Sequence, residues 1–138
     1  MMSNQTSDLP LVGDKLGTNP FVDLTEDYKV LEWYDGPLLS CARFPGNPQW
    51  YVLHWADVDS RCNRWIVYDV SPTDLDVMAN KDNTSTCREI ISRSKELYLL
   101  DIDNEFQHVA TYRVTFNELD SYGVLPAESM TYGNPDSV

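Results

Sequence analysis

The chain has 138 residues and a mass of 15.8 kDa, a length typical of one domain. Its 22 acidic and ten basic residues give a net charge of −12, which argues against a basic surface that neutralises the phosphates of nucleic acid or of a membrane. The sequence contains no run of about 18 apolar residues, and residues 1–10 lack the basic and apolar regions of a secretory signal. We therefore expect a cytoplasmic protein that binds neither nucleic-acid phosphates nor a membrane.

The first residues of the chain predict a flexible or wrapping tail, because polar residues, Gly and Pro dominate and no helix or strand period persists. Phe21 and Val22 are its expected anchors on the domain. Deletion of residues 1–20 is expected to leave a folded protein. The predicted organisation is a tail, one domain and a second tail, over residues 1–24, 25–126 and 127–138.

Four strands are predicted in the first half of the domain, over residues 28–35, 37–44, 49–58 and 64–70. Turn signals such as Pro45-Gly46-Asn47-Pro48 separate them, and their spacing of about ten residues predicts an antiparallel meander. Residues 49–58 place apolar side chains on both faces of their strand, which is typical of a central strand covered on both sides.

Two short helices and two strands are predicted in the second half. Ser71 is placed to cap a helix that starts at Pro72, and Thr86 with Glu89 forms a capping box for a helix through about Arg93. The further strands are predicted over residues 96–103 and 106–116. In the last strand the expected inward side chains are Phe106, Ala110, Tyr112, Val114 and Phe116, and Thr111 is among those expected to face outward. Residues 117–138 predict a loop. This order predicts an α+β fold with an antiparallel sheet of about six strands.

No motif in the sequence predicts catalysis. Cys41, Cys62 and Cys87 form no C-x-x-C pair, and His54 and His108 stand at no metal-like spacing to them. We therefore expect three reduced thiols, no catalytic residues, no metal and no cofactor, and thus a protein that is not an enzyme.

Positive charge is concentrated in one part of the chain. Residues 61–95 carry a net charge of +1, whereas residues 1–60 carry −6 and residues 96–138 carry −7. The cations of this part are Arg61, Arg64, Lys81, Arg88, Arg93 and Lys95. Gathered together, these side chains could bind the phosphates of a nucleotide. The alternative, which we favour, is that they form surface ion pairs with neighbouring acids.

Acidic side chains form a second candidate site. The candidates are Asp101, Asp103, Glu105, Glu118 and Asp120, with Asp57 and Asp59. They could present carboxylates to a protein that normally binds phosphates, although solubility alone also explains such a charge. These acid-rich turns could hold a divalent metal, but they lack the central Gly and the distal Glu of an EF-hand loop.

Aromatic residues form the third candidate, because seven of them lie on the predicted four-strand unit: Trp33, Tyr34, Trp50, Tyr51, Trp55, Trp65 and Tyr68. Some of these, with Trp33 and Trp55 as the candidates, could anchor a partner protein or stack on a base. In the alternative arrangement, the helices cover one face of the sheet and residues 1–24 cover the other.

Three segments together resemble an uncharacterised domain of small bacterial and phage-associated proteins. They are Tyr34-Asp35-Gly36-Pro37-Leu38-Leu39, the strand that ends at Val70-Ser71, and Cys87-Arg88-Glu89-Ile90-Ile91. The resemblance covers residues 28–126 and implies no activity and no functional residue.

The function expected from these observations is that of a small, acidic, non-enzymatic binding protein. Small acidic domains without catalytic motifs are often encoded by phages or mobile elements, and by this analogy the partner is a host defence protein that is inhibited by surface occupation. The alternatives are a sponge that sequesters a signalling nucleotide and a metal-dependent nucleotide hydrolase. A homodimer is compatible with the sequence.

Overall fold

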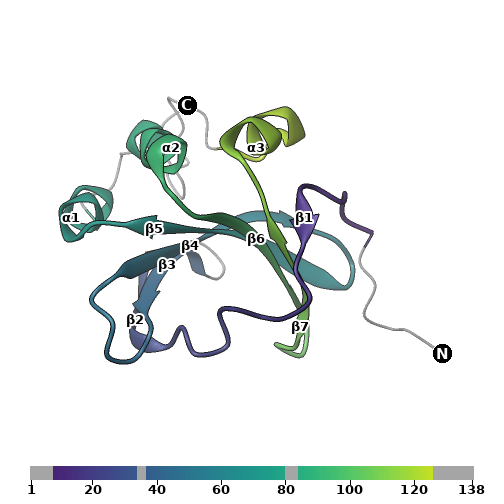
Figure 1. Cartoon of the computed structure of the whole chain (residues 1–138), viewed down its shortest axis with the longest axis horizontal. Helices are drawn as coiled ribbons and strands as arrows, with labels where there is room; N and C mark the ends of the chain where they lie inside the picture. The colour runs from purple at the N-terminus through teal and green to yellow at the C-terminus, as the bar shows by residue number, and fades with distance from the viewer. Residues whose placement is uncertain (1–7, 34–36, 80–83, 126–138) are drawn as a thin grey trace.

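The computed structural model describes residues 8–33, 37–79 and 84–125, and its centre is an antiparallel sheet (Figure 1). Within these ranges seven strands lie in the order β1-β7-β6-β5-β4-β3-β2. The strands are β1 (Asp14–Lys15), β2 (Glu26–Trp33), β3 (Pro37–Arg43), β4 (Trp50–Val58), β5 (Cys62–Val70), β6 (Leu97–Asp103) and β7 (His108–Arg113). The α+β class with an antiparallel sheet is confirmed.

The sheet is a meander in which β2 to β7 are neighbours in the order of the chain. The four strands predicted for the first half pair as expected, and two helices occupy the connection from β5 to β6. From β2 to β7 each pairing joins consecutive strands, and all but the β5–β6 pair are connected by short segments that help to set the register.

The seventh strand was not predicted. β1 has only two residues and pairs antiparallel with the outer edge of β7, where Asp14 lies opposite Arg113. Gly13 precedes it with a φ of 75°, and a Cβ at this position would lie 2.2 Å from the carbonyl oxygen of Arg113. Only glycine allows the backbone to approach β7 this closely. A strand of two residues has no hydrophobic period, so the sequence pattern could not reveal it.

Three helices lie on one face of the sheet (Figure 1): α1 (Pro72–Ala79), α2 (Thr84–Arg93) and α3 (Phe116–Tyr122). The hydroxyl of Ser71 accepts a hydrogen bond from the backbone N–H of Asp74 at 3.0 Å, which confirms the predicted start of α1. The predicted start of α2, at Cys87 after the cap Thr86, is wrong by three residues. Because α2 begins at Thr84, the expected capping box at Thr86 and Glu89 lies inside the helix.

Helix α3 corrects the prediction of a loop after residue 116. The Thr115 hydroxyl accepts from the backbone N–H of Glu118 at 3.1 Å, and the Glu118 carboxylate accepts from the backbone N–H of Thr115 at 2.9 Å. This reciprocal capping box starts the helix, and Gly123 ends it with a φ of 88°. The predicted last strand therefore stops at Arg113 instead of continuing to residue 116.

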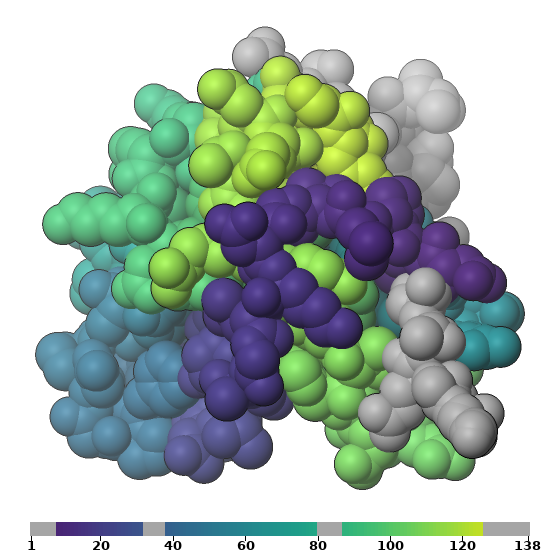
Figure 2. Space-filling view, turned by 45° about the vertical axis from the view of Figure 1, so that its right-hand side comes forward, coloured from purple at the N-terminus to yellow at the C-terminus, as the bar shows by residue number. Residues whose placement is uncertain are grey.

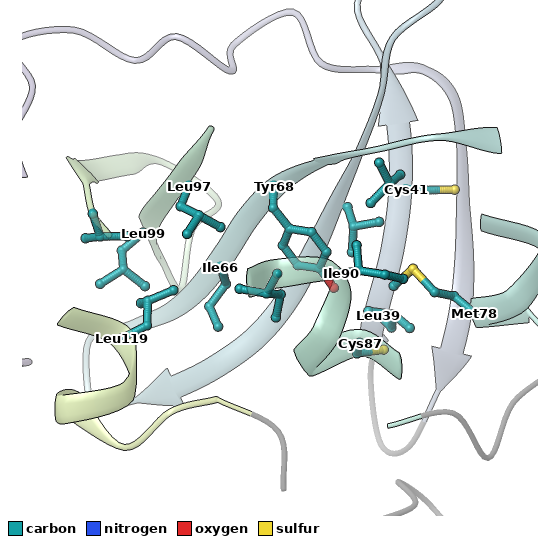
Figure 3. Close-up of a cluster of buried hydrophobic side chains, with 14 of the residues drawn as sticks. Leu39, Cys41, Ile66, Tyr68, Met78, Cys87, Ile90, Leu97, Leu99 and Leu119 are labelled. Atoms are coloured by element: carbon teal, nitrogen blue, oxygen red, sulfur yellow. The ribbon is translucent and has the colours of Figure 1, made fainter. Parts of the chain in front are cut away.

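The main hydrophobic core lies between the helices and the sheet (Figure 3). Ile66 and Tyr68 of β5 and Leu99 of β6 meet Ile90 of α2 and Leu119 of α3, all at most 1% exposed. The alternation of apolar residues along the strands directs these side chains to one face. Complete burial of a side chain of this size contributes about 1.5–3 kcal/mol.

The N-terminal segment covers the opposite face of the sheet as it runs from β1 at one edge to β2 at the other (Figures 1 and 2). The ring of Phe21 packs edge-on against Tyr98, with 4.9 Å between the ring centroids. Phe21 is 8% exposed, but Val22 is 68% exposed, so only the first of the two expected anchors is buried. Both faces of the sheet are therefore covered, as in the alternative arrangement considered for the aromatic residues.

Two inward or outward assignments in the predicted strand 106–116 are wrong. Phe106 was expected to face the core but is 87% exposed, because it lies in the turn that precedes β7. Thr111 was expected to face solvent but is fully buried, because the N-terminal segment packs over it. The backbone N–H of Leu16 donates to the carbonyl of Thr111 at 2.8 Å in this contact.

Candidate functional site

The cations of residues 61–95 do not gather into one site in the part of the chain that is described. Arg88 bonds Asp120 of α3 at 3.0 Å, and Arg93 bonds Asp74 of α1 at 3.2 Å. The hydrogen bonds that Arg93 donates to the Asp74 carboxylate, with the charge of that carboxylate, raise the pKa of Arg93 above its usual value. These two arginines therefore point from α2 towards different helices, and each has a carboxylate partner. Lys81 lies outside the described residues.

Arg64 and Asp101 form a buried ion pair instead of contributing to a surface. They lie opposite each other on β5 and β6, and both side chains have no exposed area. The guanidinium binds the carboxylate with two hydrogen bonds, from Nε at 2.7 Å and from Nη2 at 2.8 Å. Burial acts to lower the pKa of Arg64, but the hydrogen bonds and charge of Asp101 outweigh it and raise that pKa above its usual value.

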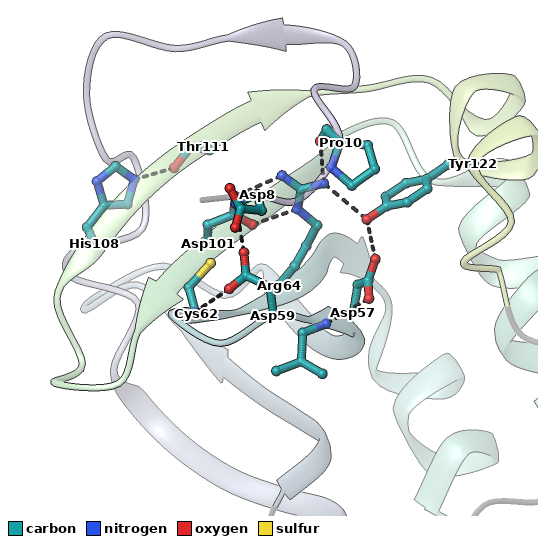
Figure 4. Close-up of polar contacts among 11 residues, drawn as sticks. Asp8, Pro10, Asp57, Asp59, Cys62, Arg64, Asp101, His108, Thr111 and Tyr122 are labelled. Carbon is teal, nitrogen blue, oxygen red and sulfur yellow. Dashed lines mark hydrogen bonds and ion pairs between the residues drawn. The ribbon is translucent and has the colours of Figure 1, made fainter. Parts of the chain in front are cut away.

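Further polar groups surround this pair (Figure 4). Nη1 of Arg64 donates to the carbonyl of Pro10 at 2.6 Å and contacts the hydroxyl of Tyr122 at 3.1 Å. That hydroxyl donates to Asp57 at 2.6 Å. Burial and the bond to Asp57 raise the pKa of Tyr122 to about 12, and Arg64 opposes this shift. The network thus connects the N-terminal segment, the centre of the sheet and α3.

The position of Arg64 and Asp101 changes their expected role. Neither side chain is accessible to a nucleotide or to a protein partner, so neither belongs to a binding surface. The sequence showed their charges but not their burial, because a buried Arg and an exposed Arg give the same local pattern. Their role is to connect parts of the fold.

The remaining acids of the candidate set lie partly in intramolecular contacts. Glu118 caps α3, Asp120 pairs with Arg88 and Asp57 accepts from Tyr122. Asp103 and Glu105 lie instead at the turn between β6 and β7, which points away from the helices (Figure 1). Glu105 is exposed in this turn, and Asp103 is partly buried.

The β6–β7 turn is held by its own hydrogen bonds. The Asp103 carboxylate accepts from the backbone N–H groups of Glu105 at 2.9 Å and of Gln107 at 2.8 Å. The backbone N–H of Phe106 donates to the carbonyl of Asp103 at 3.0 Å. These bonds leave the Glu105 side chain and the Phe106 ring pointing into solvent.

The turn between β4 and β5 lies beside it. The amide side chain of Asn104 donates to the carbonyl of Ser60 at 3.2 Å, and the backbone N–H of Asn104 donates to the carbonyl of Arg61 at 3.2 Å. The Asp59 carboxylate accepts from the backbone N–H groups of Arg61 and Cys62. We name these two turns, residues 58–61 and 103–107, the tip surface. Arg61 is thus separated from the arginines of α2 and lies among acids.

Of the two candidate tryptophans, Trp55 has a described side chain. Trp55 is partly buried, and its indole N–H donates to the amide oxygen of Asn63 at 2.9 Å. Trp33 is the last residue of β2, and its side chain lies outside the description. The exposed aromatic side chain of the tip surface is Phe106. Its exposure was not predicted from the sequence, because Phe106 continues the apolar alternation of the predicted strand 106–116.

Each histidine lies within hydrogen-bonding distance of a hydroxyl group and has a pKa lowered by burial. His54 is 1% exposed, and burial lowers its pKa to about 4; its Nδ1 lies 3.1 Å from the hydroxyl of Tyr68. Burial also lowers the pKa of His108, whose Nε2 lies 2.7 Å from the hydroxyl of Thr111. Across the described ranges, no three His, Cys, Asp or Glu side chains converge as a metal site would need. The three cysteines are buried and form no disulfide bond.

One open cavity of about 670 Å³ lies where the β3–β4 connection, the end of β5 and the helices α1 and α2 meet. Its polar lining groups already have partners. Arg93 bonds Asp74 there, and Ser94 donates to the carbonyls of Asp69 and Ile90. The cavity therefore provides no group that is set aside for a ligand.

Comparison of the chain with protein-family models, with curated proteins and with solved structures finds no match in any of the three. The resemblance to a domain of bacterial and phage-associated proteins thus gains no support from these comparisons. The helices of the described ranges are all too short or too polar to cross a membrane.

Proposed function

We propose that this chain is a non-enzymatic binding protein that acts by occupying the surface of another protein. The observation that carries the proposal is the distribution of charge. Four of the six arginines have an aspartate partner within the described ranges, whereas the Glu105 side chain is exposed at the end of the sheet, next to the partly buried carboxylate of Asp103. A protein with a basic surface is the partner that this arrangement favours.

The same distribution argues against the nucleotide sponge. A phosphate bound at Arg88 or Arg93 would have to displace Asp120 or Asp74. Arg88 lies in the middle of α2 and pairs towards α3, whereas Arg93 ends α2 and pairs towards α1. The metal-dependent hydrolase alternative needs several carboxylates that converge on a metal. The Asp103 carboxylate is instead engaged by the backbone of its own turn. That the partner is a host defence protein remains an expectation by analogy.

The test combines ligand binding with partner capture. Calorimetry against linear and cyclic nucleotides should show no binding tighter than ~1 µM, which corresponds to about −8 kcal/mol. Affinity capture with the tagged full chain should recover a protein whose association slows as the salt concentration rises. Nucleotide binding below ~1 µM without a protein partner would contradict the proposal.

A charge-matched pair of variants localises the effect. Asp103→Asn with Glu105→Gln removes two charges from the tip surface, and the asparagine keeps an oxygen that can accept the turn's hydrogen bonds. Asp76→Asn with Glu89→Gln removes the same charge from exposed positions on α1 and α2. The first pair should slow association about threefold to tenfold at low salt, and the second should change it less than about twofold.

A further inference from the structure

The most exposed large apolar side chain of the described residues has no role in the fold. Phe106 is 87% exposed at the tip of the β6–β7 turn, and neither core cluster includes it. A solvent-facing Phe gains nothing from hydrophobic burial within its own chain. Aromatic side chains, Phe included, are enriched at protein interfaces relative to the rest of the surface.

The backbone at this position is fixed by hydrogen bonds within the turn. Phe106 has a φ of 63°, in the left-handed region that bulky residues seldom adopt. The hydrogen bonds that Asp103 receives from both sides of it fix the turn, and the backbone N–H of Asp103 also donates to the carbonyl of Gln107 at 2.9 Å. A fixed turn loses less conformational entropy when a partner binds it.

The surroundings of the ring define the chemistry of a partner. Val58 on the adjacent β4–β5 turn is 47% exposed and adds a second apolar side chain to the tip surface. Asp59, Asp103 and Glu105 give this surface three carboxylates, against one cation at Arg61. A second copy of the chain would bring the same acids against them, so electrostatic repulsion disfavours self-association through this surface.

We propose that the tip surface docks on a protein whose apolar pocket has a rim of Lys and Arg side chains, with Phe106 in the pocket and Glu105 on the rim. This inference rests on the proposed function and specifies the surface and the partner chemistry. The ring supplies the buried apolar contact, and the acids supply steering and orientation at the edge of the interface.

The experiment places a photo-crosslinking phenylalanine analogue at position 106 of the full chain, and at position 22 as a control, in a lysate of the cells that make the protein. Val22 is a suitable control because it is 68% exposed and lies on the N-terminal segment. The crosslinked peptide from position 106 should contain apolar residues flanked by Lys or Arg. Position 22 should not crosslink to that peptide.

Affinities for the partner then separate binding from folding. Phe106→Ala should weaken binding about 30-fold or more, as truncation of a dominant interface residue does, whereas Val22→Ala should stay within about twofold. Phe106→Gly removes the ring and also suits the positive φ, so its thermal midpoint should equal or exceed that of the wild type while binding is lost.

Three other outcomes of these experiments would contradict the proposed docking surface, its partner chemistry, or both proposals. A partner bound equally well by the wild type and by Phe106→Ala would refute the docking surface but leave the proposed function intact. Crosslinks from position 106 to a second copy of the chain, or to a peptide without Lys or Arg, would refute the partner chemistry. Absence of any bound protein, together with tight nucleotide binding, would refute both proposals.

Discussion

Replacement of Arg64 by Met should be among the most damaging single changes in this protein. It removes two hydrogen bonds to Asp101, one to Pro10 and the contact with Tyr122, and it leaves a fully buried carboxylate without its partner. Breaking a buried pair in this way costs about 3–5 kcal/mol of unfolding free energy. Because domains of this size are stable by only about 5–15 kcal/mol, the loss is easily measured.

Urea unfolding followed by tryptophan fluorescence provides the assay, with the Arg64→Met, Asp101→Leu double variant completing a cycle. The double variant should recover much of the loss, because it leaves no unpaired charge and roughly conserves volume. Recovery should be incomplete, since the carbonyl of Pro10 still loses its donor. Arg88→Met is the control, and its exposed pair should cost at most about 1 kcal/mol. A loss below about 1 kcal/mol for Arg64→Met, or strictly additive losses in the double variant, would refute the reasoning.

Three other outcomes are expected. Phe21→Ala should cost about 3–5 kcal/mol in the same assay, whereas Val22→Ala beside it should change stability by less than about 0.5 kcal/mol; equal effects would mean that the N-terminal segment does not pack as described. Burial lowers the pKa of His54 from 6.5 to about 4. The free energy of unfolding should therefore keep its full value above pH 6.5 and fall by up to ~3 kcal/mol as the pH drops towards 4. This pH dependence should disappear in His54→Gln if His54 is the group responsible. Gly13→Ala should cost about 1–3 kcal/mol by thermal unfolding, and a neutral result would show that β1 can withdraw from β7 without loss.

The parts of the fold that the sequence predicted are those with local signals. Turn residues and apolar alternation located β2 to β7 within a few residues, and Ser71 located the start of α1. Helix α3 was missed although Thr115 and Glu118 form a capping box, because its seven residues follow directly on the apolar alternation of β7. Strand β1 was missed because its pairing joins positions about a hundred residues apart and leaves no local trace.

The candidate site was predicted only in part, because the sequence indicates local features such as turns but not which side chains the tertiary structure buries. Exposure of Glu105 follows from its place in a turn, which the sequence indicates. Burial of Asp101 depends on its position opposite Arg64 and on coverage by α3 and the N-terminal segment, which are tertiary relations. Composition shows how many charges a chain has, but the three-dimensional arrangement decides which of them solvent can reach.

The buried guanidinium of Arg64 has a consequence for the order in which the protein is made. Synthesis proceeds from the N-terminus, so Pro10 and Arg64 exist before Asp101, and Asp101 exists before Tyr122. Until the aspartate has been made, burial of Arg64 would leave a positive charge without a counter-charge, at a cost of several kcal/mol. The growing chain must therefore keep Arg64, near the start of β5, in contact with water although β2 to β5 have already been synthesised. Translation of β6 removes this constraint, so the ion pair makes completion of the core wait for the last third of the chain.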